Sequence, residues 1–303
     1  SSGVSLTVID KITTNGVVQF SPANTAPNLT TYEDNGLYFR NAPSDVLQGA
    51  VLAGKAINAG IANMATIARQ DPYGEGLAAA VVKDFTAAGG NITSALLYDP
   101  AAPSFEAEVA EIVAGAPEAV VVVGFDESTK LIQEMIKQGA GPDKIQLYLV
   151  DGNASTTAFA EFPAGTMTGT VATFPSGSVD VTTFNDRMLA FDPSLTDFLY
   201  GPQSFDATML IALAAHQAGC ADGTSIAANL ISVAGDGGEE CTTYADCVAL
   251  IDAGTAIDYM GVNGGSDFNQ YGDLLEGTIS INEYTSNTEY EEIGSLTAVV
   301  PEP

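Results

Sequence analysis

The stretch over residues 64–91 constrains the fold more than any other part of the chain. Residues 64–68 form a short apolar run typical of a buried strand, and residues 70–74 follow as a turn. Apolar residues then recur at helical spacing over 77–88, and a Gly-Gly pair ends the pattern. With a second strand predicted over 92–98, this is a strand-helix-strand unit, and such a unit predicts a parallel sheet.

The start of that helix carries several matching signals. Asp71 fits the N-cap, Pro72 fits the first helical position, and Glu75 lies in the first turn, where the helix dipole favours an anion. Tyr73 lies on the turn at the carboxyl end of its strand, the edge at which open α/β sheets bind ligands. Tyr73 is therefore either a ligand contact or a cover for the helix start, and the turn alone favours neither.

The same arrangement repeats along the chain. Short apolar strands are predicted over 37–40, 119–123 and 145–150. With the strand at 64–68 these make four strands, and the polar and aromatic residues that follow them are Asp45, Tyr73, Phe125 and Asp151. Because parallel strands place their carboxyl ends at one edge of a sheet, we expect these side chains to gather there. Asp45 has a second interpretation, as a cap of the helix predicted over 46–58.

Two segments near the start of the chain are further candidates. A helical pattern over 4–12 lies directly behind a Ser-Ser-Gly turn, so the helix start offers free backbone N–H groups to an anion. The small polar loop 21–27 follows a strand predicted over 17–20, again at a strand's carboxyl end. Taken alone, this loop is better explained as a plain surface loop.

The charge of the chain excludes several kinds of partner. Lys and Arg number 9 against 38 Asp and Glu, which gives a net charge of −29. Such a polyanion does not attract nucleic acid or acidic lipid. The acids are dispersed, so they indicate a solvated surface suited to a saline or extracellular setting, with cation binding as the weaker alternative. No apolar stretch is long enough to cross a bilayer.

Three cysteines exclude a disulfide-rich scaffold. A local disulfide between Cys241 and Cys247 is sterically plausible in an oxidising medium, while the two other pairings, each with Cys220, stay open. The single histidine, His216, lies in an apolar helical pattern and is better explained as structural, so no metal site is predicted. The chain also lacks phosphate-binding and nucleophile motifs, so we expect no cofactor and no enzymatic activity.

A set of strings, taken in order, resembles the periplasmic solute-binding proteins of the leucine/isoleucine/valine-binding type. The strings are SPANTAP at 21–27, YFRNAPSDVLQG at 38–49, DPYGEG at 71–76, the apolar pattern at 105–112, FDA at 205–207, and the segments 259–264 and 267–273. The resemblance implies an α/β fold of two doubly wound parallel-sheet lobes, joined by crossing segments, with the ligand in the cleft between them.

The resemblance also implies the division of the chain. Lobe 1 is expected at 1–44 and 174–262, and lobe 2 at 45–173 and 263–303. The family's chains begin with further strands and helices of lobe 1, so lobe 1 is expected to be incomplete at its N-terminus. An uncovered sheet edge and apolar face would then favour self-association.

On the carboxylate side of the site, the resemblance implies four residues. Ser2 matches the position whose hydroxyl and neighbouring amides hold a ligand carboxylate, and Ala23 and Thr25 match a second carboxylate loop. Asn24 departs from the usual small residue, which would narrow the pocket. Hydroxyl and N–H groups suit a carboxylate because both donate hydrogen bonds.

On the amine side, the resemblance implies four more. Asp45 and Asp151 match positions that take the ligand's ammonium group, and Tyr73 and Phe125 match the aromatic walls. The implied function is that of a substrate-binding protein of an ABC importer, secreted or lipid-anchored, which binds a branched-chain or related amino acid and docks on an ABC permease. The alternative is an extracellular sensory or structural protein that reuses the fold.

Overall fold

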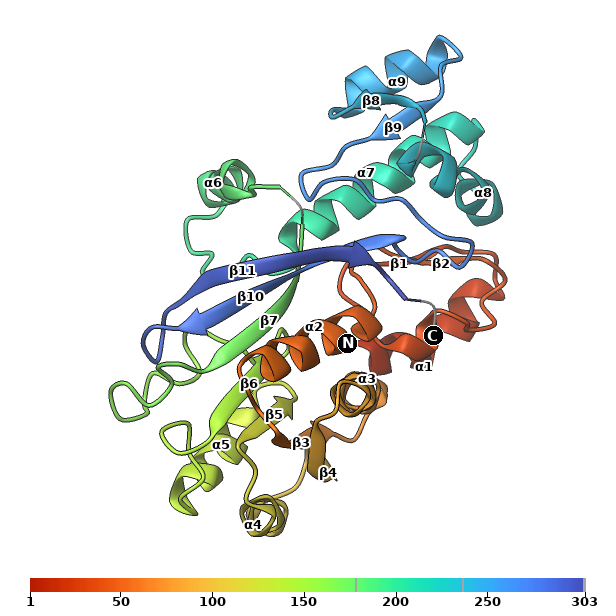
Figure 1. Cartoon of the computed structure of the whole chain (residues 1–303). Helices are drawn as coiled ribbons and strands as arrows, with labels where there is room; N and C mark the ends of the chain where they lie inside the picture. Colours follow the sequence, from red (N-terminus) through yellow and green to blue (C-terminus); the bar gives the residue numbers. More distant parts are fainter. Residues whose placement is uncertain (178, 236, 302–303) are drawn as a thin grey trace.

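The largest unit of the computed structural model, which describes residues 1–177, 179–235 and 237–301, is a seven-stranded sheet (Figure 1). Its order is β11-β10-β7-β6-β5-β3-β4. In chain order the strands are β3 (Asn63–Arg69), β4 (Asn91–Tyr98), β5 (Ala119–Val123), β6 (Gln146–Val150), β7 (Val171–Ser176), β10 (Glu276–Tyr284) and β11 (Tyr290–Val299). Strands β3 to β7 pair in parallel, whereas β10 runs antiparallel to both of its neighbours, β7 and β11.

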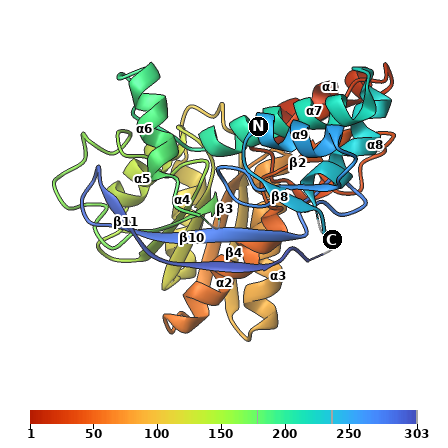
Figure 2. The ribbon, with the colours of Figure 1, turned by 90° about the horizontal axis from the view of Figure 1, so that it is seen from above.

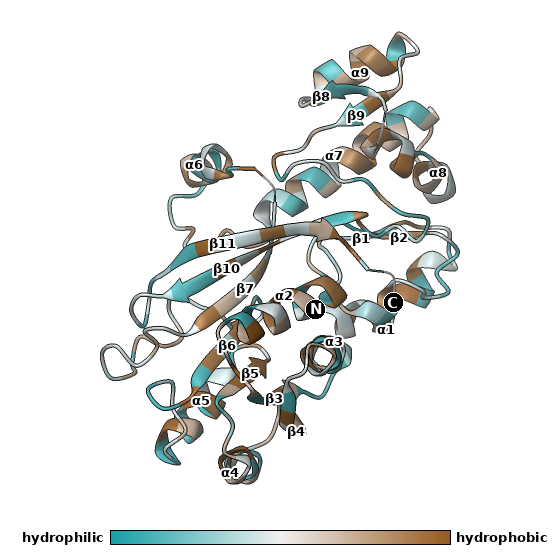
Figure 3. Ribbon diagram, in the orientation of Figure 1, coloured by the Kyte–Doolittle hydropathy of each residue, from teal (hydrophilic) through white to brown (hydrophobic). Residues whose placement is uncertain are grey.

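Helices cover both faces of this sheet (Figures 1 and 2). One face is packed beneath α2 (Asp45–Asn58) and α3 (Pro72–Ala87), which contact each other. The other face carries α4 (Glu106–Gly115) and α5 (Ser128–Lys137). The valines of β5 alternate between the two cores, so this strand is buried on both faces, as its apolar run predicts. Figure 3 shows this hydrophobic strand and the contrasting hydrophilic β8.

The second lobe is built from short parallel pairs and helices. The pairs are β1 (Gln19–Ser21) with β2 (Tyr38–Arg40), and β8 (Glu239–Cys241) with β9 (Ile257–Tyr259). Its helices are α1 (Ser2–Thr13), the short 3-10 helix η1 (Pro27–Leu29), α7 (Gly201–Ala218), α8 (Gly223–Ala234) and α9 (Tyr244–Asp252). Helix α6 (Thr182–Phe191) lies between β7 and α7 in the chain. The fold is therefore the expected α/β architecture of two lobes, while the exact lobe boundaries stay a prediction.

The local signals in the sequence match the elements that form. Helix α3 begins at Pro72, and Oδ1 of Asp71 accepts a hydrogen bond of 2.9 Å from the amide of Gly74, so the predicted N-cap is present. Strand β1 begins two residues later than expected, at Gln19, because its pairing with β2 begins there, where Gln19 lies opposite Tyr38. Helix α7 begins at Gly201, with a proline in its first turn.

A buried ion pair links strand β2 of the second lobe to the segment that leads into β10. Nε and Nη2 of Arg40 each lie 2.7 Å from a carboxylate oxygen of Asp273, and both side chains are nearly inaccessible to solvent. The hydroxyl of Thr30 donates to the same carboxylate at 2.6 Å. The neighbouring Gly272 has φ +77°, and a Cβ there would lie 2.4 Å from the carbonyl oxygen of Tyr38, so only glycine fits this turn.

The cysteines fall into two groups. Cys241 and Cys247 form a disulfide with a Cα–Cα distance of 5.3 Å, which ties β8 to α9. Cys220 is free and exposed, and its thiol donates to Oδ2 of Asp222. Within the described residues, no helix is long and apolar enough to span a membrane, and no group of three or more His, Cys, Asp or Glu side chains is placed to hold a metal ion.

Candidate ligand-binding site

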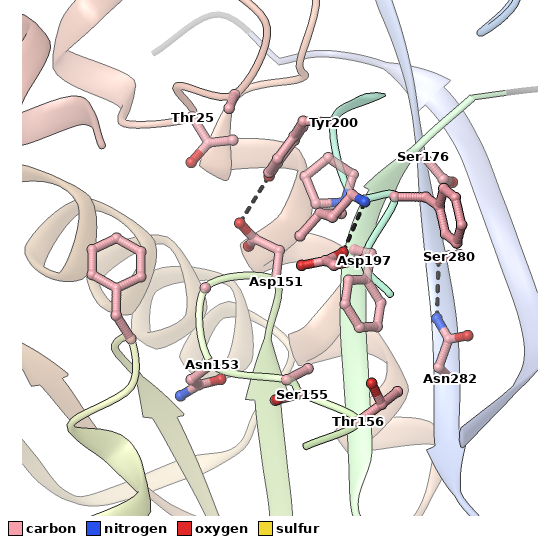
Figure 4. A pocket seen from close by; sticks show the side chains of 18 of the residues that line it. Thr25, Asp151, Asn153, Ser155, Thr156, Ser176, Asp197, Tyr200, Ser280 and Asn282 are labelled. Carbon is pink, nitrogen blue, oxygen red and sulfur yellow. Dashed lines mark hydrogen bonds between the residues drawn. The ribbon is translucent and has the colours of Figure 1, made fainter. Parts of the chain in front are cut away.

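A cleft of about 630 Å³ lies at the carboxyl ends of the parallel strands. The sheet lobe contributes Tyr73 after β3, Phe125 after β5 and Asp151 after β6. The second lobe faces them with the start of α1, the loop after β1 and the start of α7 (Figures 1 and 4). Six of the eight residues predicted for ligand binding line this one cleft: Ser2, Ala23, Thr25, Tyr73, Phe125 and Asp151.

Asp151 is the centre of the cleft's hydrogen-bond network. Its Oδ1 accepts from Nε2 of Gln48 at 2.9 Å and from the hydroxyl of Tyr73 at 3.1 Å. Its Oδ2 accepts from the hydroxyl of Tyr200 at 2.8 Å, as Figure 4 shows. Three neutral donors thus surround a carboxylate that is only 8% exposed, and among the described residues no cationic side chain pairs with it.

Burial governs the electrostatics of this network. It raises the pKa of Asp151, while the hydrogen bonds from Gln48, Tyr200 and Tyr73 act in the opposite direction. Burial, and then the negative charge of Asp151, raise the pKa of both Tyr73 and Tyr200 well above that of a free phenol. Both tyrosines therefore stay protonated and donate. A ligand ammonium group at Asp151 would supply the positive charge that the network lacks.

Two aromatic rings form the predicted wall beside Asp151. The rings of Tyr73 and Phe125 stack with centroids 5.3 Å apart and planes inclined by 9°. The guanidinium carbon of Arg69 lies 4.3 Å from the centroid of Phe125, on an arginine held by ion pairs of 2.7 Å to Asp71 and to Glu127. The wall is therefore fixed by contacts behind it as well as by stacking.

The start of α1 and the loop after β1 form the opposite wall. The hydroxyl oxygen of Ser2 accepts hydrogen bonds from the amides of Thr25 at 3.3 Å and Ala26 at 3.2 Å. This contact brings the predicted anion-binding helix start and the predicted carboxylate loop together. Since the Ser2 oxygen accepts both bonds, its own hydroxyl proton is free to be donated to a ligand carboxylate.

The other two predicted residues lie outside the cleft lining. Asn24 is buried, and its Oδ1 accepts a hydrogen bond of 3.1 Å from the hydroxyl of Tyr38, so its side chain is directed into the second lobe. Asp45 is fully buried as the first residue of α2, where Ser44 is the N-cap. Burial followed by repulsion from Asp151 raises the pKa of Asp45 well above 3.8, while the hydroxyl of Thr25 and the charge of Arg40 act in the opposite direction.

The structure also adds cleft residues that the sequence did not indicate. Tyr200 lies at the N-cap of α7 with φ 61°, a backbone conformation that is uncommon for tyrosine. Ser280 and Asn282 of β10 line the cleft as well. The charged residues of the lining are Asp126, Asp151 and Asp197, and the described lining contains no Lys, Arg or His side chain. The cleft is therefore negative, which favours a ligand that carries an amine.

Comparisons with known proteins agree with this fold. The family model described as "Receptor family ligand binding region" matches residues 1–287. The leucine-binding protein LivK of Thermotoga maritima has a TM-score of 0.78 and 18% identity, over 96% of this chain and 76% of its own. A solute-binding protein of an ABC transporter from R. palustris in complex with benzoate has a TM-score of 0.77 and 15% identity, over 99% and 77% of the two chains.

Two further proteins are also similar to this chain. An ABC transporter substrate-binding protein from Desulfitobacterium hafniense in complex with Leu has a TM-score of 0.71 and 19% identity, over 96% of this chain and 77% of its own. An uncharacterized protein of Methanocaldococcus jannaschii is 31% identical over 133 residues, which is 41% of this chain and 32% of that protein. The match thus spans about a third of that relative. At these identities the solved structures establish the shared fold.

Proposed function

Because the chain belongs to the family of receptor ligand-binding regions, we propose that it is the substrate-binding protein of an ABC importer, with a branched-chain or related amino acid as its ligand. Its place of action is outside the cytoplasm, either in the periplasm or at the cell surface on a lipid anchor. Its partners are this small molecule and an ABC permease. Solved proteins of the same fold are solute-binding proteins of ABC transporters, and two of them are described with leucine.

One observation carries the choice of ligand class. Asp151 is buried at the centre of the cleft and accepts only neutral donors, in a lining without a described Lys, Arg or His side chain. A simple carboxylic acid such as benzoate would bring a second negative charge to this place, and like charges repel strongly where water is excluded. An α-amino acid brings an ammonium group for Asp151 together with a carboxylate for Ser2 and Thr25.

Binding would act through closure of the two lobes. The carboxylate partners Ser2 and Thr25 belong to the second lobe, and the ammonium partner Asp151 belongs to the sheet lobe. A ligand that contacts both lobes stabilises the closed form by its differential affinity for that form. The permease can then distinguish the loaded protein from the empty one by shape.

Titration calorimetry tests the proposal with L-leucine, L-isoleucine, L-valine and benzoate as probes. We expect heat with at least one amino acid and none with benzoate. Asp151→Asn should weaken amino-acid binding roughly a hundredfold, because a charge-assisted bond is lost. Asp126→Asn is the matched control, since it removes the same charge from the exposed rim of the cleft. Heat with benzoate alone would overturn the proposal.

A further inference from the structure

Strand β10 has an apolar face and a polar face, and both are buried. Ile279 packs with Leu47 and Val51 of α2 on one face. On the other face Thr278, Ser280 and Asn282 are 7%, 6% and 7% exposed. A sheet face that packs against a core is normally apolar, and one that faces water is exposed. This face of β10 is polar and yet buried, a combination that is typical of a strand that lines a binding site.

Two of these polar residues face the cleft described above. Ser280 and Asn282 line it (Figure 4), whereas Thr278 lies outside the lining and shares a hydrogen bond of 2.8 Å with Thr297. Nδ2 of Asn282 donates to Oγ of Ser280 at 3.0 Å. Because that oxygen accepts, the Ser280 hydroxyl proton is available as a donor, and the Asn282 carbonyl is available as an acceptor.

The register of the sheet shows how many strands separate this pair from Asp151. Val150, which precedes Asp151, is level with Thr173 on β7, and Thr173 is level with Ile281, which lies between Ser280 and Asn282. Two strand spacings separate the rows, a distance of about 10 Å. Asp151, Ser280 and Asn282 line the same cleft across this span, so one ligand can contact Asp151 with its amine and the pair with its side chain.

The surroundings of the pair disfavour a negatively charged group. The rings of Phe174 and Tyr290, whose centroids are 5.3 Å apart, also line this half of the cleft. Asp197 lies close enough for its charge to act on Tyr290, and no cationic side chain lines the cleft in the described part of the chain. Flat rings, a donor and an acceptor suit an uncharged polar group, whereas a carboxylate side chain would be repelled.

Building on the proposed function, and narrowing its ligand from the branched-chain amino acids to related ones with a polar side-chain end, we propose that Ser280 and Asn282 form a side-chain subsite that selects amino acids ending in an uncharged hydrogen-bonding group, a carboxamide or a hydroxyl. The ammonium group of the ligand lies at Asp151, and its side chain extends along the sheet to β10. An aliphatic side chain of the same shape would leave both polar groups of the subsite without partners, and this is how such sites reject apolar analogues.

Calorimetry with three pairs of amino acids tests this subsite. The pairs are asparagine with leucine, glutamine with methionine, and tyrosine with phenylalanine, which differ in polarity much more than in shape. We expect the polar member of at least one pair to bind more than tenfold tighter. Ser280→Ala and Asn282→Leu should each reduce that preference about tenfold, because the polar member binds more weakly while the apolar member binds equally well or more tightly, and the retained apolar binding shows that the variant is folded. Thr278→Val is the matched control, because it removes a hydroxyl from the same strand face outside the cleft.

The outcomes separate the two proposals. If leucine, methionine and phenylalanine bind at least as tightly as their polar counterparts, the subsite is overturned and the amino-acid function stands. A preference for the polar members that survives both substitutions also overturns the subsite. If none of the six amino acids binds, the proposed function fails, and the subsite fails with it.

Discussion

The hydroxyl of Tyr200 donates a hydrogen bond of 2.8 Å to Oδ2 of Asp151, and this bond joins the two lobes across the cleft (Figure 4). Tyr200 belongs to the start of α7 in the second lobe, and Asp151 follows β6 of the sheet lobe. The tyrosine adopts φ 61°, so the chain accepts an uncommon backbone conformation where this contact is made. The two lobes are therefore linked across the cleft by a hydrogen bond between protein side chains alone.

Tyr200→Phe should therefore shift the ligand-free protein towards an open form. A hydrogen bond to a charged group contributes about 1.5–3 kcal/mol, so the open-to-closed ratio should rise roughly tenfold to a hundredfold. Single-molecule fluorescence transfer between dyes on the two lobes measures that ratio. Tyr244→Phe, on the exposed side of α9, is the control and should leave it unchanged. An unaltered ratio in Tyr200→Phe would show that the bond does not hold the lobes.

The buried carboxyl groups of Asp45 and Asp151 make a prediction about pH. Burial raises the pKa of Asp45 well above 3.8 and also raises that of Asp151. The folded state therefore binds more protons than the unfolded chain, so the free energy of unfolding should fall as pH rises from about 4 through the folded pKa values. Urea unfolding between pH 4 and pH 8 measures this slope. Asp45→Asn should flatten it, whereas Glu111→Gln, on an exposed face, should not.

The ion pair between Arg40 and Asp273 makes a prediction about stability. Asp273→Asn replaces the carboxylate partner of the buried Arg40 guanidinium by a neutral amide. Breaking such a buried pair lowers the free energy of unfolding by about 3–5 kcal/mol. Urea unfolding at neutral pH should record that loss. Asp143→Asn, which breaks the exposed pair with Lys144, should change the free energy of unfolding by less than about 1 kcal/mol. Equal effects of the two substitutions would contradict the prediction.

Part of the site follows from the order of strands and turns in the sequence. Tyr73, Phe125 and Asp151 each follow an apolar strand, and parallel pairing brings such positions to one edge, so their convergence could be expected before any coordinates. Thr25 joins them because Ser2 binds the amides of its loop. The resemblance supplied this pairing of two segments, which no periodicity in the chain indicates.

The remaining site residues depend on contacts between distant segments. Nothing in the loop before α7 shows that Tyr200 adopts a left-handed conformation and reaches Asp151. The alternation of β10 predicts a strand, but only its antiparallel register beside β7 turns Ser280 and Asn282 towards the cleft. Helix-capping rules allow either Ser44 or Asp45 as the cap of α2, and they do not indicate that the Asp45 side chain is fully buried.

The last prediction concerns Arg69, a positioning residue behind the aromatic wall. Its guanidinium lies 4.3 Å from the ring centroid of Phe125 and forms ion pairs of 2.7 Å with Asp71 and Glu127. Arg69→Lys keeps the charge but loses the planar fork that makes these contacts together. Phe125 and the stacked Tyr73 should then lose part of their fixed orientation, and the affinity for the bound amino acid should fall roughly threefold to tenfold.

Calorimetry and thermal unfolding of the same samples separate positioning from general stability. A purely structural role for Arg69 would lower the unfolding temperature and leave the affinity of the folded fraction intact, whereas a positioning role lowers the affinity itself. Arg187→Lys is the matched control, because its guanidinium lies 5.8 Å from the ring of Phe184 and 5.6 Å from that of Phe205, and Arg187 is not part of the cleft lining. The control should leave the affinity unchanged, since the rings that it supports do not face the ligand.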